Sequence, residues 1–206
     1  MRTKKTNKSN RSNRTYRSER TGLIPPHGGY RKLKSYQTAE VIYDGTVEFC
    51  QRWVDRTKRS YRSRTSEQMV QAARSGKQNI AEASQTSGTS KKTELKLLGV
   101  ARASLEELLQ DFLDFLRQRG LSVWGKEHPK TKEIRRLAYR TNRSYRTYRS
   151  YLEKDPEVAA NTMICLIHQA NFLLDRQIKA LEKGFLEEGG FTERLYRKRT
   201  EYRGKT

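Results

Sequence analysis

The chain of 206 residues lacks any long apolar run: only 33% of its residues are hydrophobic, and another 33% are charged. Because a bilayer crossing takes about 20 consecutive apolar residues, the sequence predicts no membrane-spanning helix and no membrane partner. No apolar stretch follows the basic N-terminus, so we expect no secretory signal and a cytoplasmic location. A chain this polar cannot pack entirely around a core, and part of it is expected to stay solvated.

The residues that usually carry catalysis or bind metals are scarce. The two cysteines, Cys50 and Cys165, fall inside apolar helical patterns, which indicates buried, reduced thiols. The three histidines are far apart, and none has a metal-type partner at helical spacing. The sequence contains neither a phosphate-cradling glycine loop nor the Glu-x-x-His pairs of di-iron bundles. We therefore expect no catalytic, cofactor or metal site, and a protein that is not an enzyme.

Strand patterns are nearly absent, because the β-branched residues are scattered and do not alternate with polar ones. Four stretches instead place apolar residues three and four positions apart, which is typical of helices that cross at about 20° in bundles. The prediction is an all-α fold, an antiparallel up-down four-helix bundle over residues 34–188. The side chains expected in its core are Trp53, Ile80, Leu98, Leu105, Leu108, Phe112, Phe115, Met163, Ile167 and Leu174.

Polar residues at the ends of these stretches predict where the helices begin. Thr65 or Ser66 is suited to cap the second helix, and Ser90 the third. Asp155, followed by a proline, is suited to begin the fourth. Between the third and fourth helices, residues 130–138 predict a short additional helix.

The net charge of +21 is concentrated in segments without apolar periodicity that are rich in Arg, Ser, Thr and Tyr. Residues 2–20, 56–64 and 139–151 carry net charges of +7, +5 and +4, which is +16 of the total. We expect residues 1–33 to be mostly disordered and residues 57–64 and 139–151 to be loop insertions. Two interpretations stay open: arginines that neutralise phosphates beside tyrosines that stack on bases, or passive insertions tolerated in loops.

Two helical segments carry a more specific pattern: residues 74–82 read RSGKQNIAE, and residues 94–108 read ELKLLGVARASLEEL. They resemble the bacterial four-helix bundle family that includes proteins encoded within intervening sequences of 23S ribosomal RNA genes. They are also similar to the accessory protein of diversity-generating retroelements. The tail GGFTERLYR at 189–197 resembles the C-terminal suffix of one branch of this family. The resemblance implies a bundle that forms homo-oligomeric rings, often pentamers, and a basic ring surface that holds nucleic acid.

Several basic residues lie outside the low-complexity segments, on the expected helices and in the basic suffix 189–206. The candidate nucleic-acid contacts are Arg74, Lys77, Lys91, Lys92, Lys96, Arg194, Arg197, Lys198 and Arg199. One hypothesis is a non-enzymatic oligomeric scaffold associated with RNA or DNA through this basic surface. The alternative is a structural or protein-interaction oligomer without a nucleic-acid role. The sequence does not distinguish RNA from DNA.

Overall fold

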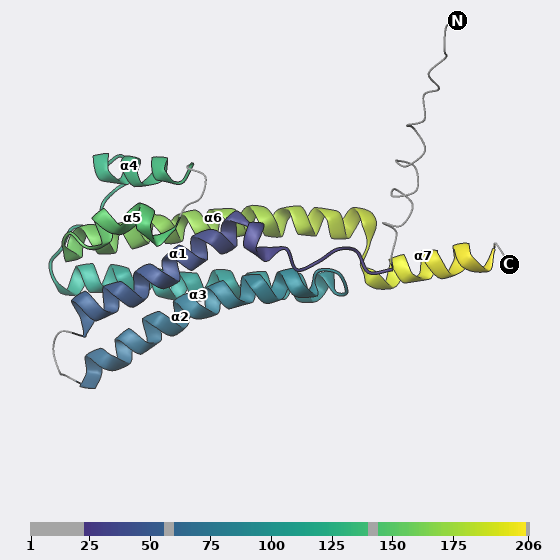
Figure 1. The fold of residues 1–206 in the computed structure, drawn as a ribbon, viewed down its shortest axis with the longest axis horizontal. Helices are drawn as coiled ribbons and strands as arrows, with labels where there is room; N and C mark the ends of the chain where they lie inside the picture. The colour runs from purple at the N-terminus through teal and green to yellow at the C-terminus, as the bar shows by residue number, and fades with distance from the viewer. Residues whose placement is uncertain (1–22, 56–59, 140–143, 205–206) are drawn as a thin grey trace, which may run out of the picture.

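The computed structural model describes residues 23–55, 60–139 and 144–204, and this part of the chain is helical without any strand, as the sequence predicts. None of these helices combines the length and apolar character that a membrane crossing requires. The elements, shown in Figure 1, are a 3-10 turn at Tyr30–Lys32, α1 at Lys34–Phe49 with a π-helical turn at Cys50–Val54, α2 at Ser60–Thr86, α3 at Lys91–Gln118, α4 at Pro129–Leu137, α5 at Tyr145–Leu152, α6 at Pro156–Glu188 and α7 at Phe191–Arg203.

Four long helices surround the core. Helices α1 and α3 each pack against both α2 and α6. The side chain of Ser35, at the start of α1, donates a hydrogen bond of 2.9 Å to Gln177 in the last turns of α6, so these helices run antiparallel. The shorter α4 and α5 lie against α6, and α7 continues beyond the end of α6, away from the long helices (Figure 1).

The core lies between these long helices. Of the side chains expected there, all except Trp53 are buried. Trp53 is only partly buried and packs against the edge of the core, because the π-helical turn interrupts the helical rhythm that placed it. Phe49 joins α1 to α3, since its ring meets those of Phe112 and Phe115 edge-on at 4.9 and 4.7 Å.

Two of the predicted helix starts are confirmed. The Ser90 side chain accepts a hydrogen bond of 3.1 Å from the Thr93 backbone N–H and caps α3. The Asp155 carboxylate accepts one of 2.8 Å from the Val158 N–H and caps α6. The short helix expected over residues 130–138 is also present as α4.

The predicted start of α2 is wrong. The helix begins at Ser60, so Thr65 and Ser66 lie inside it, and residues 60–64 are helical rather than part of a loop insertion. Ser66 is buried, and its hydroxyl donates a hydrogen bond of 3.1 Å to Asp55. The segment contains neither glycine nor proline, so nothing in it stops the helix from extending toward its N-terminus.

The loop insertion expected over residues 139–151 is likewise wrong for residues 145–151, which form most of α5. The side chains of Tyr148 and Leu152 are only 1% and 2% exposed, and α5 packs against both α1 and α6. Tyr148 and Leu152 are four residues apart, which is a helical spacing. The repeated Arg and Tyr residues around them make this pattern hard to recognise in the sequence. The rest of the low-complexity sequence, residues 1–22, 56–59 and 140–143, lies outside the described residues.

Glycines allow neighbouring helices to approach closely at two points. A Cβ atom at Gly45 of α1 would lie 2.8 Å from Met163 Sδ of α6. One at Gly76 of α2 would lie 2.8 Å from Leu105 Cδ2 of α3. These distances are shorter than any ordinary contact, so a side chain at either position would have to displace its neighbour. Met163 is long and flexible and can give way, whereas the branched Leu105 at Gly76 has less room to move. Gly99, on the outer surface of α3, has no neighbouring atom within 4 Å of the same position.

Leu105→Ala tests the packing of α3. Leu105 is fully buried, so the substitution leaves a cavity, and we expect it to lower the free energy of unfolding by about 2–5 kcal/mol. Leu186→Ala is the matched control, because Leu186 is 84% exposed and its truncation opens no cavity. Urea unfolding followed by circular dichroism measures both. Equal effects of the two substitutions would contradict the register of α3.

Gly76→Ala and Gly99→Ala test the close approach of α2 and α3. Both replace a helical glycine, which alone favours folding by about 0.5–1 kcal/mol. At Gly99 we expect that gain, whereas at Gly76 the contact with Leu105 should reverse it and destabilise the protein by about 1–2 kcal/mol. Thermal and urea unfolding of the two variants measure the difference. A stabilised Gly76→Ala variant would show that the two helices are not in close contact.

Candidate nucleic-acid interface

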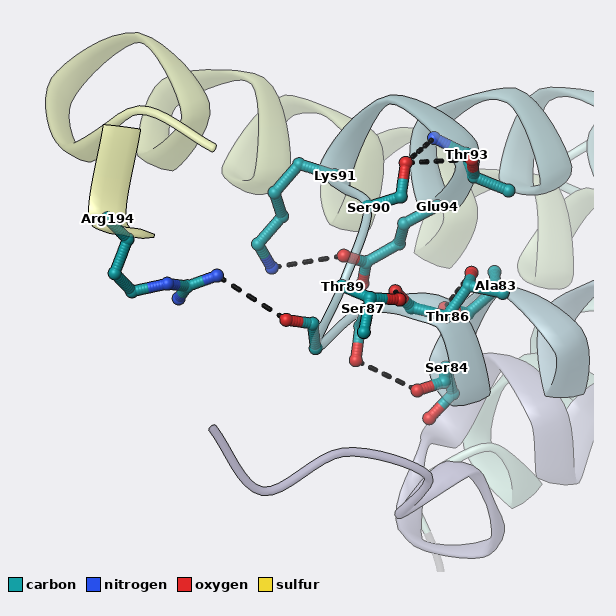
Figure 2. A network of polar contacts seen from close by, with 11 residues as sticks. Ala83, Ser84, Thr86, Ser87, Thr89, Ser90, Lys91, Thr93, Glu94 and Arg194 are labelled. Carbon is teal, nitrogen blue, oxygen red and sulfur yellow. Dashed lines mark hydrogen bonds and ion pairs between the residues drawn. The ribbon is translucent and has the colours of Figure 1, made fainter. Parts of the chain in front are cut away.

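Three segments that are distant in the sequence meet at one end of the molecule, around the α2–α3 turn at residues 87–90. The Gly28 N–H donates a hydrogen bond of 2.9 Å to the Ser84 carbonyl, which holds residues 23–33 against the end of α2. From the other direction, the Arg194 guanidinium of α7 donates one of 3.4 Å to the Gly88 carbonyl. Figure 2 shows Arg194 and Lys91 beside this turn. The α2–α3 turn is thus fixed from two directions.

Side chains of this turn also donate hydrogen bonds to nearby backbone carbonyls, as the close view in Figure 2 shows. The Thr86 hydroxyl donates to the Ala83 carbonyl at 3.1 Å, and the Ser87 hydroxyl donates to the Ser84 carbonyl at 2.8 Å. Such side-chain bonds to nearby carbonyls are typical of ordered turns. The first turns of α3, which carry three lysines, therefore start from a fixed position.

We call this part of the molecule the basic end and define it by the cations of early α3 and of α7. Its residues are Lys91, Lys92, Lys96, Arg194, Arg197, Lys198, Arg199 and Arg203. Lys91 forms an ion pair of 3.0 Å with Glu94, whereas Lys92 and Lys96 are exposed, four residues apart on one side of α3.

The corner between α6 and α7 sets the direction of α7. Gly189 ends α6 with a φ of 75°, a conformation that favours glycine. The Glu193 carboxylate accepts a hydrogen bond of 2.8 Å from the Gly190 N–H, and Arg197 donates one of 2.8 Å to the Glu188 carbonyl. Backbone N–H groups of Glu193 itself and of Gly190 lower the pKa of the Glu193 carboxyl below its usual value. Hydrogen bonds across the corner therefore hold α7 in place, and the Glu193 carboxylate takes part in one of them.

The candidate contacts Arg74 and Lys77 lie apart from the basic end. The Lys77 ammonium sits 4.2 Å from the centre of the Tyr43 ring, at the contact between α2 and α1. Arg74 is exposed but lies 14 residues before Gly88, a distance of about 20 Å along a helix that rises 1.5 Å per residue. The structure thus places Lys91, at the start of α3, beside Arg194 of α7, whereas Arg74 and Lys77 lie farther back along α2.

Among the α7 candidates, Arg194 has a structural role because it anchors the helix to Gly88. Arg197 and Arg199 are exposed, and Lys198 is half-buried. Two exposed tyrosines lie beside these cations, Tyr196 at 73% and Tyr202 at 76%. The candidate contacts from the sequence do not include Arg203 or the two tyrosines, although the sequence places all three among the other cations of the suffix.

The part of the chain that the structure describes includes all three histidines and both cysteines. In this part of the chain no three His, Cys, Asp or Glu side chains converge as metal ligands would. Burial raises the pKa of the Cys50 thiol to about 12, and burial also raises the pKa of Cys165. Neither thiol is therefore a thiolate nucleophile at neutral pH.

Comparisons of the chain with protein-family models, curated proteins and solved structures find no match. The features of this chain that bear on its function are therefore the chemistry of the basic end and the segments at 74–82 and 94–108.

Proposed function

We propose that this chain is a cytoplasmic, non-enzymatic scaffold that forms homo-oligomers and associates with RNA or DNA through the basic end. Its architecture is that of an antiparallel up-down four-helix bundle formed by α1, α2, α3 and α6. The mutual packing of these four helices supports the bundle. The resemblance of residues 74–82 and 94–108 to the intervening-sequence family supports both the bundle and a ring, with a pentamer as the expected size.

The observation that carries the nucleic-acid proposal is the excess of cations over carboxylates at the basic end. Within the described part of the chain, neither Lys92 nor Lys96 forms an ion pair. The acidic residues of α7 are Glu193 and Glu201, and Glu193 binds the backbone of the α6–α7 corner. Cations placed in this way bind phosphates and release counterions, which supplies most of the affinity for nucleic acid.

An oligomer would strengthen this binding. Each copy contributes only a few phosphate contacts, which bind weakly by themselves. Several copies held in one ring present the same contacts to one strand, and binding at the second copy becomes an intramolecular event. The scaffold and the basic end therefore act together in this proposal.

Replacing both Lys92 and Lys96 by Gln tests the nucleic-acid role. We expect weaker binding to both RNA and DNA, and a log–log salt dependence that is shallower by about 0.7–0.9 for each phosphate that the variant no longer neutralises. The matched control replaces Lys126 and Lys154 by Gln, which removes the same charge from exposed positions outside the basic end. Fluorescence anisotropy with labelled RNA and DNA over a range of salt concentrations measures both variants. Undetectable binding by the parent chain, or equal weakening in both variants, would refute the proposal.

A second candidate function is that of a structural or protein-interaction oligomer without a nucleic-acid role. Exposed apolar side chains on α6 favour it: Phe172 is 59% exposed, Leu186 is 84% exposed and Phe185 is 38% exposed. Phe172 lies 13 residues before Phe185, about 20 Å along the helix, so these side chains are two separate exposed apolar points that a protein partner would cover.

Light scattering distinguishes the two candidates. For the RNA- or DNA-binding scaffold we expect a solution mass that is a multiple of the chain mass of 24.2 kDa and that rises when RNA or DNA is added. An oligomer whose mass does not change when RNA or DNA is added would favour the second candidate. A mass equal to that of one chain would contradict the oligomer in both.

A further inference from the structure

The outer side of α6 carries cations around one exposed aromatic ring. His168, Phe172, Arg176 and Lys179 follow one another at intervals of four, four and three residues, which places them within about 80° of one another around the helix. Phe172 is 59% exposed, and the other three side chains are exposed as well. The Arg176 guanidinium lies 5.8 Å from the centre of the Phe172 ring, so these two side chains share one surface. We call these four residues the α6 face.

The cations of the α6 face are not neutralised by neighbouring carboxylates. Among the residues that the structure describes, neither Arg176 nor Lys179 forms an ion pair. Asp175, the residue before Arg176, instead pairs with Arg102 of α3 at 2.8 Å. Two α6 faces would repel each other, so this face suits an acidic partner.

The outer side of α3 has the opposite charge in its C-terminal half. Ala103, Glu107, Gln110 and Asp114 follow one another at intervals of four, three and four residues, and all four are exposed. Burial and the neighbouring carboxylates of Asp114 and Glu107 raise the pKa of the Asp111 carboxyl above its usual value. Carboxylates therefore crowd this part of α3, and a cation brought beside them relieves their repulsion. We call the four exposed residues the α3 face.

The two faces of one molecule do not meet each other. Helices α3 and α6 contact each other through a different side of each helix, where Arg102 binds Asp175 and the Asn171 amide donates a hydrogen bond of 3.1 Å to Glu106. Consecutive residues of a helix point about 100° apart, so Glu107 is turned away from the side on which Glu106 meets α6. A contact between an α3 face and an α6 face therefore requires two copies of the chain.

We propose that the α6 face of one copy binds the α3 face of a second copy. The cations of the α6 face then lie beside the carboxylates of Glu107 and Asp114, and Ala103 leaves room for the Phe172 ring. This inference rests on the proposed homo-oligomer and names the surfaces that form it. Asp114 already pairs with Arg117 at 2.8 Å, but both side chains are more than half exposed, and such pairs contribute little to stability.

The contact joins two different surfaces, so each copy uses its α6 face toward one neighbour and its α3 face toward the other. Contacts of this head-to-tail kind close into a ring when the rotation between neighbours allows it. Opposite charges favour this pairing over contact between two like faces. No residue of the basic end belongs to either face, so the cations that we propose for nucleic acid stay available in the oligomer.

The test reverses the charge of one face at a time in the full chain. One variant combines Arg176→Glu with Lys179→Glu, and another combines Glu107→Lys with Asp114→Lys. Each variant places like charges across the contact, so we expect the protein concentration at which the oligomer dissociates to rise by about tenfold or more. Size-exclusion chromatography with light scattering over a range of concentrations measures the mass. All four side chains are exposed, so circular dichroism should show the helix content of the parent.

A third variant carries all four substitutions and so restores opposite charges across the contact, with their positions exchanged. It should form the oligomer of the parent at the concentration that the parent requires. The matched control combines Lys126→Glu with Lys154→Glu, which changes the charge as much as the α6 variant does, at exposed positions outside both faces. Its mass should equal that of the parent.

The inference is overturned if the parent is an oligomer and neither reversal alters its dissociation, if the control dissociates as readily, or if the fourfold variant does not reassemble. It is also overturned if the α6 variant keeps its mass but loses affinity for labelled RNA, since the α6 face would then bind nucleic acid. In each of these cases the oligomer of the proposed function survives. A parent chain with the mass of a single copy would instead refute that oligomer itself.

Discussion

Gly76 and Leu105 are so close that one added carbon on the glycine would lie 2.8 Å from the leucine side chain, so a larger residue at position 76 would displace this side chain or the helices. Near it, the hydroxyls of Ser75 and Ser104 share a hydrogen bond of 2.9 Å, and the Asn79 amide donates to the Ser75 carbonyl. The pair is thus held by apolar packing along both helices and by a small polar network at this point. Because the two helices are antiparallel, fixing them here also fixes the turn that joins them.

The basic end depends on that turn. Its backbone carbonyl at Gly88 accepts a hydrogen bond from Arg194, which adds to the bonds of the α6–α7 corner that hold α7. Helix α7 is therefore tied to the core helices through the Gly88 carbonyl as well as through the end of α6. The connection explains how exposed cations from early α3 and from the C-terminal helix come to share one end of the molecule.

The sequence is sufficient for features that depend on neighbours along the chain. The apolar stripe of α3 and the caps at Ser90 and Asp155 are such features, because a helix satisfies them within its own turns. The sequence is not sufficient for features that depend on contacts between helices. Tyr148 is buried because α5 packs against α1 and α6, and Arg194 reaches the α2–α3 turn because the α6–α7 corner sets the direction of α7. No local pattern contains either fact.

The position of a charge matters more than the total of +21. Arg149 belongs to an Arg/Tyr-rich segment, yet it forms an ion pair of 2.8 Å with Glu153, which also accepts Arg52 at 3.2 Å. Since Tyr148 of the same segment is buried, this segment contributes to the fold, and part of its charge is neutralised within the chain. On α7 the acidic Glu193 binds backbone instead, so cations stay in excess on that helix. Similar Arg/Tyr composition thus has different consequences, because a helix packed between neighbours uses its tyrosine as core, whereas a projecting helix leaves its tyrosines exposed.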